Sequence, residues 1–159
     1  MPTHAEQRVV PFSQGQLFDL VADVARYPDF LPWCVGARIR EARGEEILAD
    51  LMIGYKLVRE RFTSRVSLNR RAGRIDVAYT DGPFKYLDNY WVFREHPDGC
   101  LIDFHVDFEF RSVLLEKLIV SLFKEAVKRM VGAFEQRAYA LYGDCGGGVI
   151  RFKGDKTEL

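Results

Sequence analysis

Hydrophobic and polar residues alternate along most of this chain, which predicts a series of β-strands. The clearest strand covers residues 101–111, where from residue 102 onward apolar side chains at the even positions alternate with polar side chains at the odd ones. A period of two is typical of an antiparallel strand with one buried and one solvated face. Weaker alternation predicts further strands over residues 4–10, 35–43, 46–55, 57–68, 75–79 and 86–95.

Two segments have helical spacing instead. Ser13 and Gln16 form a capping-box pattern ahead of a short apolar helix. We expect this helix to end near Tyr27, because Pro28 disfavours helical backbone in the residue before it. Ser112 caps a second helix that runs to about Tyr142, which is long enough to cross a small domain.

This order of elements predicts an α+β fold. The apolar face of an antiparallel sheet needs a cover, and only the final helix is long enough to supply it. We therefore expect one curved antiparallel sheet wrapped around a long C-terminal helix. The domain would span residues 1–143, and the Gly-rich, charged segment 144–159 would be a flexible tail.

Composition narrows the class of protein. The 159 residues are 48% hydrophobic with a formal net charge of zero, which fits one globular domain and gives no global sign of a nucleic-acid partner. Three cysteines, Cys34, Cys100 and Cys145, have no Cys-x-x-Cys spacing, so a reducing compartment fits best. We expect no signal peptide, because the first residues lack a charged-then-apolar pattern, and no apolar run is long enough to span a bilayer. We expect a cytoplasmic protein.

The stretch YPDFLPWC, residues 27–34, is too apolar for an ordinary surface loop and too rich in proline for regular structure. Trp33 is either a rigid aromatic presented by a proline-stiffened loop or a plug in the core. Cys34 is interpreted as a small buried hydrophobe rather than a nucleophile, because nothing nearby would activate it.

The final helix carries more apolar surface than a single covering face needs. Its core-facing stripe is Phe123, Val127, Met130, Val131, Phe134, Ala138 and Leu141. A second stripe follows Leu115, Leu118, Ile119, Leu122 and Ala126. Either residues 27–33 bury this second stripe, or it meets a partner, a lipid or a membrane. In the second case Lys117, Lys124 and Lys128 would meet anionic head groups.

Three motifs in order resemble one known family. YPDFLPWC, GPFKYLDNYWVF and VDFEFRSVLL are similar to segments of the START-like coenzyme Q-binding proteins of the polyketide cyclase (SRPBCC) superfamily, over about residues 4–143. Bacterial members include ribosome-association toxins (RatA). The resemblance implies a helix-grip fold with a hydrophobic cavity between sheet and helix. It also implies non-enzymatic binding of ubiquinone, as a carrier or chaperone for respiration, at the inner face of the membrane.

The resemblance and the apolar pattern together nominate site residues. Candidate ligand-binding residues are Tyr27, Phe30, Pro32, Trp33, Phe84, Leu87, Trp91, Phe108, Phe110, Leu118, Leu122, Phe123, Val127 and Met130. Candidate membrane-contact residues are Leu115, Lys117, Ile119 and Lys124. Ubiquinone would be a bound ligand, and we expect no cofactor.

Other chemistry is less well supported. Asp103, His105, Asp107 and Glu109 share one strand face, which the alternation predicts to be solvated rather than a metal site. No nucleophile elbow or phosphate loop is present, so we expect no enzyme and no DNA partner. Arginines around one hairpin form a solvated turn or, as a ribosome-binding toxin would require, an RNA contact. These arginines are Arg65, Arg70, Arg71 and Arg74.

Overall fold

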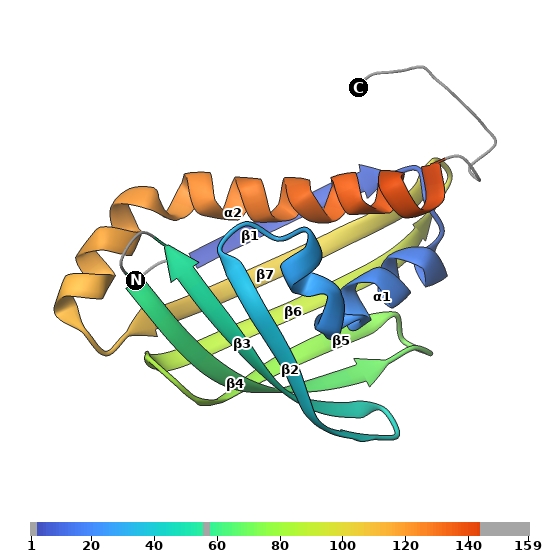
Figure 1. Cartoon of the computed structure of the whole chain (residues 1–159). Helices are drawn as coiled ribbons and strands as arrows, with labels where there is room; N and C mark the ends of the chain where they lie inside the picture. The colour runs from blue at the N-terminus through green and yellow to red at the C-terminus, as the bar shows by residue number, and fades with distance from the viewer. Residues whose placement is uncertain (1–2, 56–57, 144–159) are drawn as a thin grey trace.

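A single antiparallel sheet and one long helix make up most of the structure (Figure 1). The computed structural model describes residues 3–55 and 58–143, without the side chains of residues 55, 58 and 119–124. The strands are β1 (Thr3–Val10), β2 (Cys34–Arg43), β3 (Glu46–Tyr55), β4 (Val58–Asn69), β5 (Arg74–Asp81), β6 (Phe84–His96) and β7 (Gly99–Phe110). The helices are α1 (Gln14–Ala22), the 3₁₀ helix η1 (Val24–Asp29) and α2 (Val113–Tyr142).

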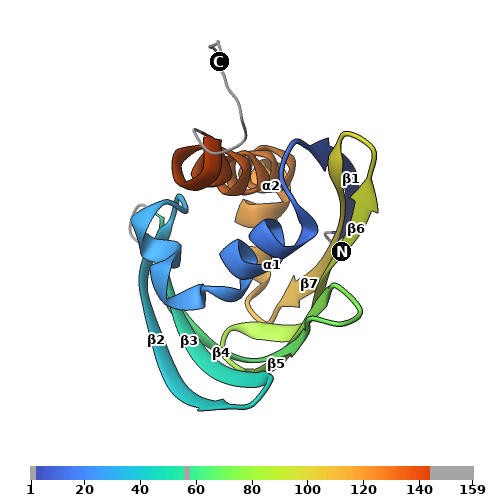
Figure 2. The ribbon, with the colours of Figure 1, turned by 90° about the vertical axis from the view of Figure 1, so that its right-hand side faces the viewer.

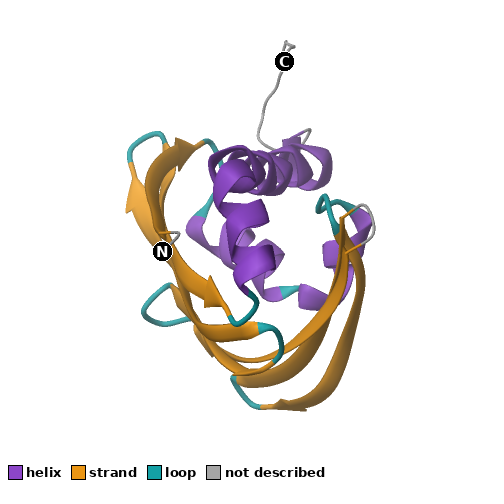
Figure 3. Cartoon of the chain, turned by 90° about the vertical axis from the view of Figure 1, so that its left-hand side faces the viewer, coloured by secondary structure: helices purple, strands orange, loops and turns teal. Residues whose placement is uncertain are grey.

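The sheet has seven strands in the order β1-β7-β6-β5-β4-β3-β2, and each strand runs antiparallel to its neighbours. It bends into a trough that holds all the helices on its concave side (Figures 2 and 3). Register shifts in β2, between Thr63 and Ser64 in β4, and between Phe84 and Tyr86 in β6 add to the bend. The predicted helix-grip fold is confirmed.

Local patterns explain the strands and the first helix. In β7, Phe104, Val106 and Phe108 are buried on the concave face, as the alternation predicts. The capping box is present, because the Ser13 hydroxyl accepts the backbone N–H of Gln16. The helix ends earlier than predicted, at Ala22, and the chain continues as η1, which accommodates Pro28 within its tighter turns.

The second half of α2 supplies the core-facing stripe. Val127, Val131, Phe134 and Ala138 are buried against the sheet and α1. Leu141 was predicted on this stripe, yet its side chain is 47% exposed. In the last turn Tyr142 takes the inward position instead, where its hydroxyl donates to the carbonyl oxygen of Gln16 at 3.2 Å. The proposed tail, residues 144–159, lies outside the described residues.

Candidate functional site

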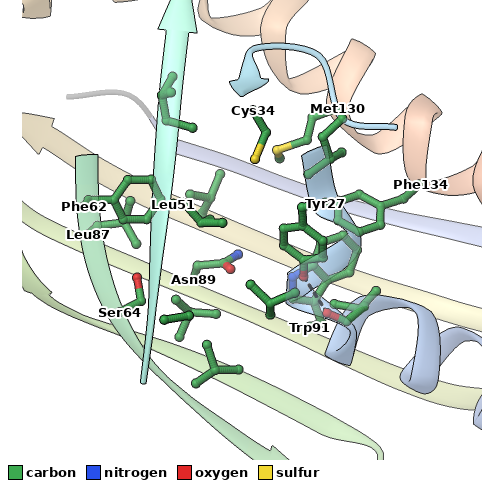
Figure 4. A pocket seen from close by; sticks show the side chains of 18 of the residues that line it. Tyr27, Cys34, Leu51, Phe62, Ser64, Leu87, Asn89, Trp91, Met130 and Phe134 are labelled. Carbon is green, nitrogen blue, oxygen red and sulfur yellow. Dashed lines mark hydrogen bonds between the residues drawn. The ribbon is translucent and has the colours of Figure 1, made fainter. Parts of the chain in front are cut away.

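An apolar cavity of about 240 Å³ lies between the concave face of the sheet and α2 (Figure 4). Its walls come from the end of α1, from η1 and the loop after it, from β2 to β7 and from α2. The lining residues are Val21, Val24, Tyr27, Leu31, Pro32, Trp33, Cys34, Ala49, Leu51, Ile53, Phe62, Ser64, Val66, Ile75, Val77, Leu87, Asn89, Trp91, Phe104, Val106, Met130 and Phe134. Nearly all of these side chains are hydrocarbon or aromatic, so the cavity suits an apolar ligand.

The YPDFLPWC stretch forms one wall of this cavity. The ring of Tyr27 packs edge-on against Phe134 with centroids 5.3 Å apart, and Phe30 does the same at 5.2 Å. The Tyr27 hydroxyl donates to the carbonyl oxygen of Val21, and burial raises the pKa of this phenol far above its usual range. The stretch is therefore anchored to the second half of α2 by neutral, apolar contacts.

That anchorage bears on the two interpretations of the second apolar stripe of α2. Residues 27–33 were one candidate cover for this stripe, and their rings Tyr27 and Phe30 pack on Phe134 in the second half of the helix instead. Of the described side chains on the stripe, Leu118 is 39% exposed, whereas Leu115 and Ala126 are half-buried. Val113 and Leu114, in the first turn of α2 beside the stripe, are 71% and 79% exposed. In Figure 1 the first turns of α2 lie at one end of the molecule, away from η1.

Six of the predicted ligand-binding residues line the cavity. They are Tyr27, Pro32, Trp33, Leu87, Trp91 and Met130. Phe30 and Val127 pack in the surrounding core instead of at the cavity surface. Leu118 is a surface residue, with 39% of its area exposed. The side chains of Leu122 and Phe123 lie outside the described part of the structure.

Phe84, Phe108 and Phe110 differ from the prediction. They lie on the concave face as expected, but they form an aromatic cluster rather than the cavity wall. Phe84 stacks on Phe110 with centroids 4.7 Å apart and meets Phe108 edge-on at 5.5 Å. Because these rings fill the space at that end of β6 and β7 with one another, the cavity stops short of them.

Cys34 lines the cavity and is only 7% exposed, in agreement with its interpretation as a buried hydrophobe. Its thiol donates to the carbonyl oxygen of Gly36 at 3.6 Å. Burial raises the pKa of the thiol, so it stays protonated near neutral pH. A protonated thiol is a poor nucleophile, and the cavity gains no reactive group from it.

Two polar lining residues, Ser64 on β4 and Asn89 on β6, were not among the predicted site residues. Ser64 is 4% exposed, and its Oγ is a buried polar atom with no hydrogen-bond partner among the described residues. Asn89 donates its amide hydrogen to the carbonyl oxygen of His105 at 2.8 Å. The sequence did carry a signal for both, because each interrupts an apolar face: Ser64 between Phe62 and Val66, and Asn89 between Leu87 and Trp91.

The predicted RNA-contact arginines are mostly engaged with acidic side chains. Arg65 pairs with Glu46 at 3.1 Å, and Arg74 pairs with Asp76 at 2.9 Å. Arg70 pairs with Asp19 at 2.7 Å and covers the ring of Phe18. Arg71 is exposed. Each ion pair reduces the positive potential that a phosphate backbone would meet.

Among the predicted membrane-contact residues, Leu115 is half-buried and Lys117 is exposed. The side chains of Ile119 and Lys124 lie outside the described residues. Within the described part of the chain, no helix has the length and apolarity needed to span a bilayer. The same residues contain no cluster of three or more His, Cys, Asp or Glu side chains arranged to hold a metal ion.

Residues 10–135 match the family described as polyketide cyclase / dehydrase and lipid transport, a range that covers most of the domain and all the strands that line the cavity. The chain belongs to this family. The family's description covers enzymes and lipid carriers alike, so membership settles the architecture and leaves the activity to the site.

Individual relatives are more specific. Ribosome association toxin RatA of Rickettsia prowazekii is 40% identical over 135 residues, covering 82% of this chain and 92% of the relative. Coenzyme Q-binding protein COQ10 homolog B, mitochondrial, of Xenopus laevis is 37% identical over 145 residues, covering 88% of this chain and 59% of the relative. Both names belong to the group that the three sequence motifs resemble, and that resemblance is confirmed.

Solved structures of similar proteins have the same fold as this chain. An 18 kDa protein of Caulobacter crescentus is 36% identical, with a TM-score of 0.74 over 90% of this chain and 99% of that one. The ZhuI aromatase/cyclase of a Streptomyces species has a TM-score of 0.80 over 93% of this chain and 99% of that one, at 15% identity. At that identity the likeness shows a shared fold only.

Proposed function

We propose that this protein binds a polyisoprenoid quinone in the cavity beneath α2, without chemical conversion, and carries it for respiratory electron transport. The observation that supports this proposal most is the lining of the cavity, which is apolar apart from Ser64 and Asn89. A relative named for coenzyme Q binding shares 37% of its aligned residues with this chain.

The size of the cavity suggests how such a ligand would sit. About 240 Å³ is below the 300–1,000 Å³ typical of ligand pockets, so the cavity fits one end of a long molecule rather than all of it. Each CH₂ group transferred from water to such a wall contributes about 0.8 kcal/mol, so a few isoprene carbons give useful affinity without polar contacts.

The polar groups of the cavity favour binding over catalysis. A hydroxyl and a carboxamide, those of Ser64 and Asn89, do not titrate near neutral pH, and the Cys34 thiol stays protonated. Tyr27 is likewise held neutral by its burial. The described lining therefore offers hydrogen bonds but no general base suited to acid–base chemistry.

The direct test is to identify what the protein carries. The protein is purified from a quinone-producing host, extracted with organic solvent, and the extract is analysed by mass spectrometry. Quinone at close to one molecule per protein is the expected result. An extract that contains only phospholipid would contradict the proposal. So would an extract without any lipid, if the purified protein also binds added quinone no better than albumin does.

We further propose that loading takes place at a membrane surface, through the start of α2. Val113 and Leu114 expose apolar side chains there, and Arg111 and Lys117 are exposed beside them. The carboxylate of Glu116 is turned back onto the fold, where it accepts the backbone N–H of Phe110 at 2.9 Å. Apolar tips flanked by cations suit a bilayer with anionic head groups.

A second candidate function is suggested by the relatives named RatA, which are up to 40% identical to this chain. In this alternative the arginine hairpin contacts the large ribosomal subunit and blocks subunit association. Arg70→Glu combined with Arg71→Glu would remove subunit binding in a sedimentation assay and leave quinone binding unchanged. If the double variant still sedimented with the large ribosomal subunit, the arginine hairpin would not be the contact surface.

A further inference from the structure

We propose that Ser64 and Asn89 form the head-group subsite of the cavity, and that they hold the oxygen-bearing ring of the quinone. This inference rests on the proposed function and deepens it. It starts from a feature of the cavity that the fold itself does not need, a buried hydroxyl that has no hydrogen-bond partner in the part of the chain that the structure describes.

Ser64 is an unfavourable residue for its surroundings. Its Oγ is buried, has no hydrogen-bond partner among the described residues, and faces a cavity walled by Phe62, Val66 and Leu87. Buried polar groups in folded proteins are almost always paired, and an exception calls for an explanation. A ligand with a hydrogen-bond acceptor at this depth would supply the missing partner.

Asn89 is fixed in an orientation that suits the same ligand. Its Nδ2 donates to the His105 carbonyl oxygen at 2.8 Å, which determines which end of the amide is nitrogen. The nitrogen keeps a second hydrogen, and the amide oxygen keeps its acceptor sites. Figure 4 shows this amide in the middle of the pocket, between Leu51 and Leu87 on one side and Tyr27 and Trp91 on the other.

The distance between Ser64 and Asn89 suits a ligand group as large as a six-membered ring, placed between the two side chains. Ser64 lies on β4 and Asn89 on β6, with β5 between them. Asn89 is aligned through Val77 with Val66, two residues along β4 from Ser64, so the two backbones are roughly 12 Å apart at about 4.8 Å per strand and 3.4 Å per residue. Side chains that extend from both positions leave room for a six-membered ring with oxygens on opposite edges. The register shift between Thr63 and Ser64 adjusts the direction of the Ser64 side chain at this point.

The test compares a quinone with its oxygen-free counterpart. Decylubiquinone and decylbenzene have the same ring size and the same alkyl chain, and the binding of each is followed by isothermal titration calorimetry. Ser64→Ala and Asn89→Leu should each weaken decylubiquinone binding roughly five- to tenfold and leave decylbenzene binding unchanged. Ser67→Ala is the matched control, because Ser67 is an exposed serine on the same strand.

The melting temperature of the unliganded protein provides a second measurement. Ser64→Ala should keep or raise it, because the substitution removes an unpartnered hydroxyl from apolar surroundings. A clear fall would show that the hydroxyl has a structural role and would overturn the inference. Equal decylubiquinone affinities for Ser64→Ala and wild type would overturn the head-group subsite alone, whereas failure of the wild type to bind decylubiquinone would overturn the proposed function as well.

Discussion

Trp33 is held in backbone geometry that an L-residue adopts only under constraint. Its φ of 66° is the only positive value among the described residues other than glycine. The backbone N–H of Gly54 donates to the carbonyl oxygen of Trp33 at 2.8 Å and ties this residue to β3. Such strain usually persists where a side chain must be kept in one place, and here that place is the cavity wall.

Two substitutions separate the strain at Trp33 from its ring. Trp33→Gly and Trp33→Ala both remove the aromatic contact, but only glycine adopts φ 66° without steric cost. The glycine variant should therefore be more stable than the alanine variant by about 1 kcal/mol in urea unfolding. Equal stabilities would show that the backbone relaxes and that the position carries no strain.

Cys100 gives the protein a predictable response to alkaline pH. The side chain is 0% exposed, and burial raises the pKa of its thiol to about 11. In the unfolded chain the thiol ionises near pH 8.5, so between these values the folded state holds more protons than the unfolded state. The free energy of unfolding therefore falls as pH rises from about 8.5 to 11, by about 1–3 kcal/mol from this group.

Cys100→Ala tests this contribution. Urea unfolding of both proteins at pH 7.5 and pH 10.5 compares the loss of stability on going to the higher pH. The variant should lose less than the wild type, since its unfolding no longer releases a thiol proton, whereas the contribution of Tyr27 is common to both. The same loss in both proteins would contradict the assignment.

At the scale of elements, the two ends of α2 serve different purposes. The first turn is capped by the Ser112 hydroxyl, which accepts the N–H of Leu115 at 3.2 Å, and it exposes Val113 and Leu114. The second half buries Val131 and Phe134 and carries one wall of the cavity. A single helix thus joins the proposed membrane contact to the proposed binding site.

This division of α2 predicts the effect of an added charge. Leu114→Asp should reduce cosedimentation with vesicles of phosphatidylglycerol and phosphatidylcholine several-fold, because a carboxylate at an exposed apolar tip is repelled by anionic lipid. Leu141→Asp is the matched control, since Leu141 is also exposed but lies in the last turn of the same helix. Both variants should unfold within about 0.5 kcal/mol of wild type. Equal loss of vesicle binding in both would exclude a specific contact at the first turn.

At the scale of the whole molecule, the sheet is larger than its helices can fill. The trough holds α1, η1 and α2, and the space left between them is the cavity (Figures 2 and 3). Most protein interiors are packed without such gaps, so the empty volume lowers the stability of the unliganded protein. A ligand that fills it should raise the melting temperature in proportion to the logarithm of its concentration above Kd.

Filling the cavity from within should separate stability from binding. Leu51→Trp places a larger side chain into space that is already present, so the free energy of unfolding should change by less than about 1.5 kcal/mol. Decylubiquinone affinity should fall at least tenfold, measured by isothermal titration. Undiminished affinity would show that the ligand binds elsewhere.

Much of this arrangement could be predicted from the chain alone. Strict alternation in residues 102–111 determined the buried face of β7, and the capping pattern at Ser13 located the start of α1. Contacts between segments that are far apart in the sequence could not be predicted. Whether Tyr27 and Phe30 meet the first or the second half of α2 depends on how the sheet curves, and no local pattern records that curvature.

The same limit explains the site residues. The alternation predicted that Phe84, Phe108 and Phe110 lie on the concave face of the sheet. Their exclusion from the cavity depends on how neighbouring rings fill space. Ser64 and Asn89 were visible as polar residues on apolar faces. Their relation to each other required the strand order, which places one strand between them.

The strand order has a consequence for how the chain is made. β1 is an edge strand whose neighbour in the sheet is β7, and Thr3 lies opposite Asp107. A ribosome that adds 5–20 residues per second finishes β7 roughly 5–20 s after β1 has been synthesised. Through that interval the first strand has no partner, and contacts of such long sequence separation make folding slow. The backbone N–H and C=O groups of β1 that later pair with β7 therefore stay without their strand partner for seconds during synthesis.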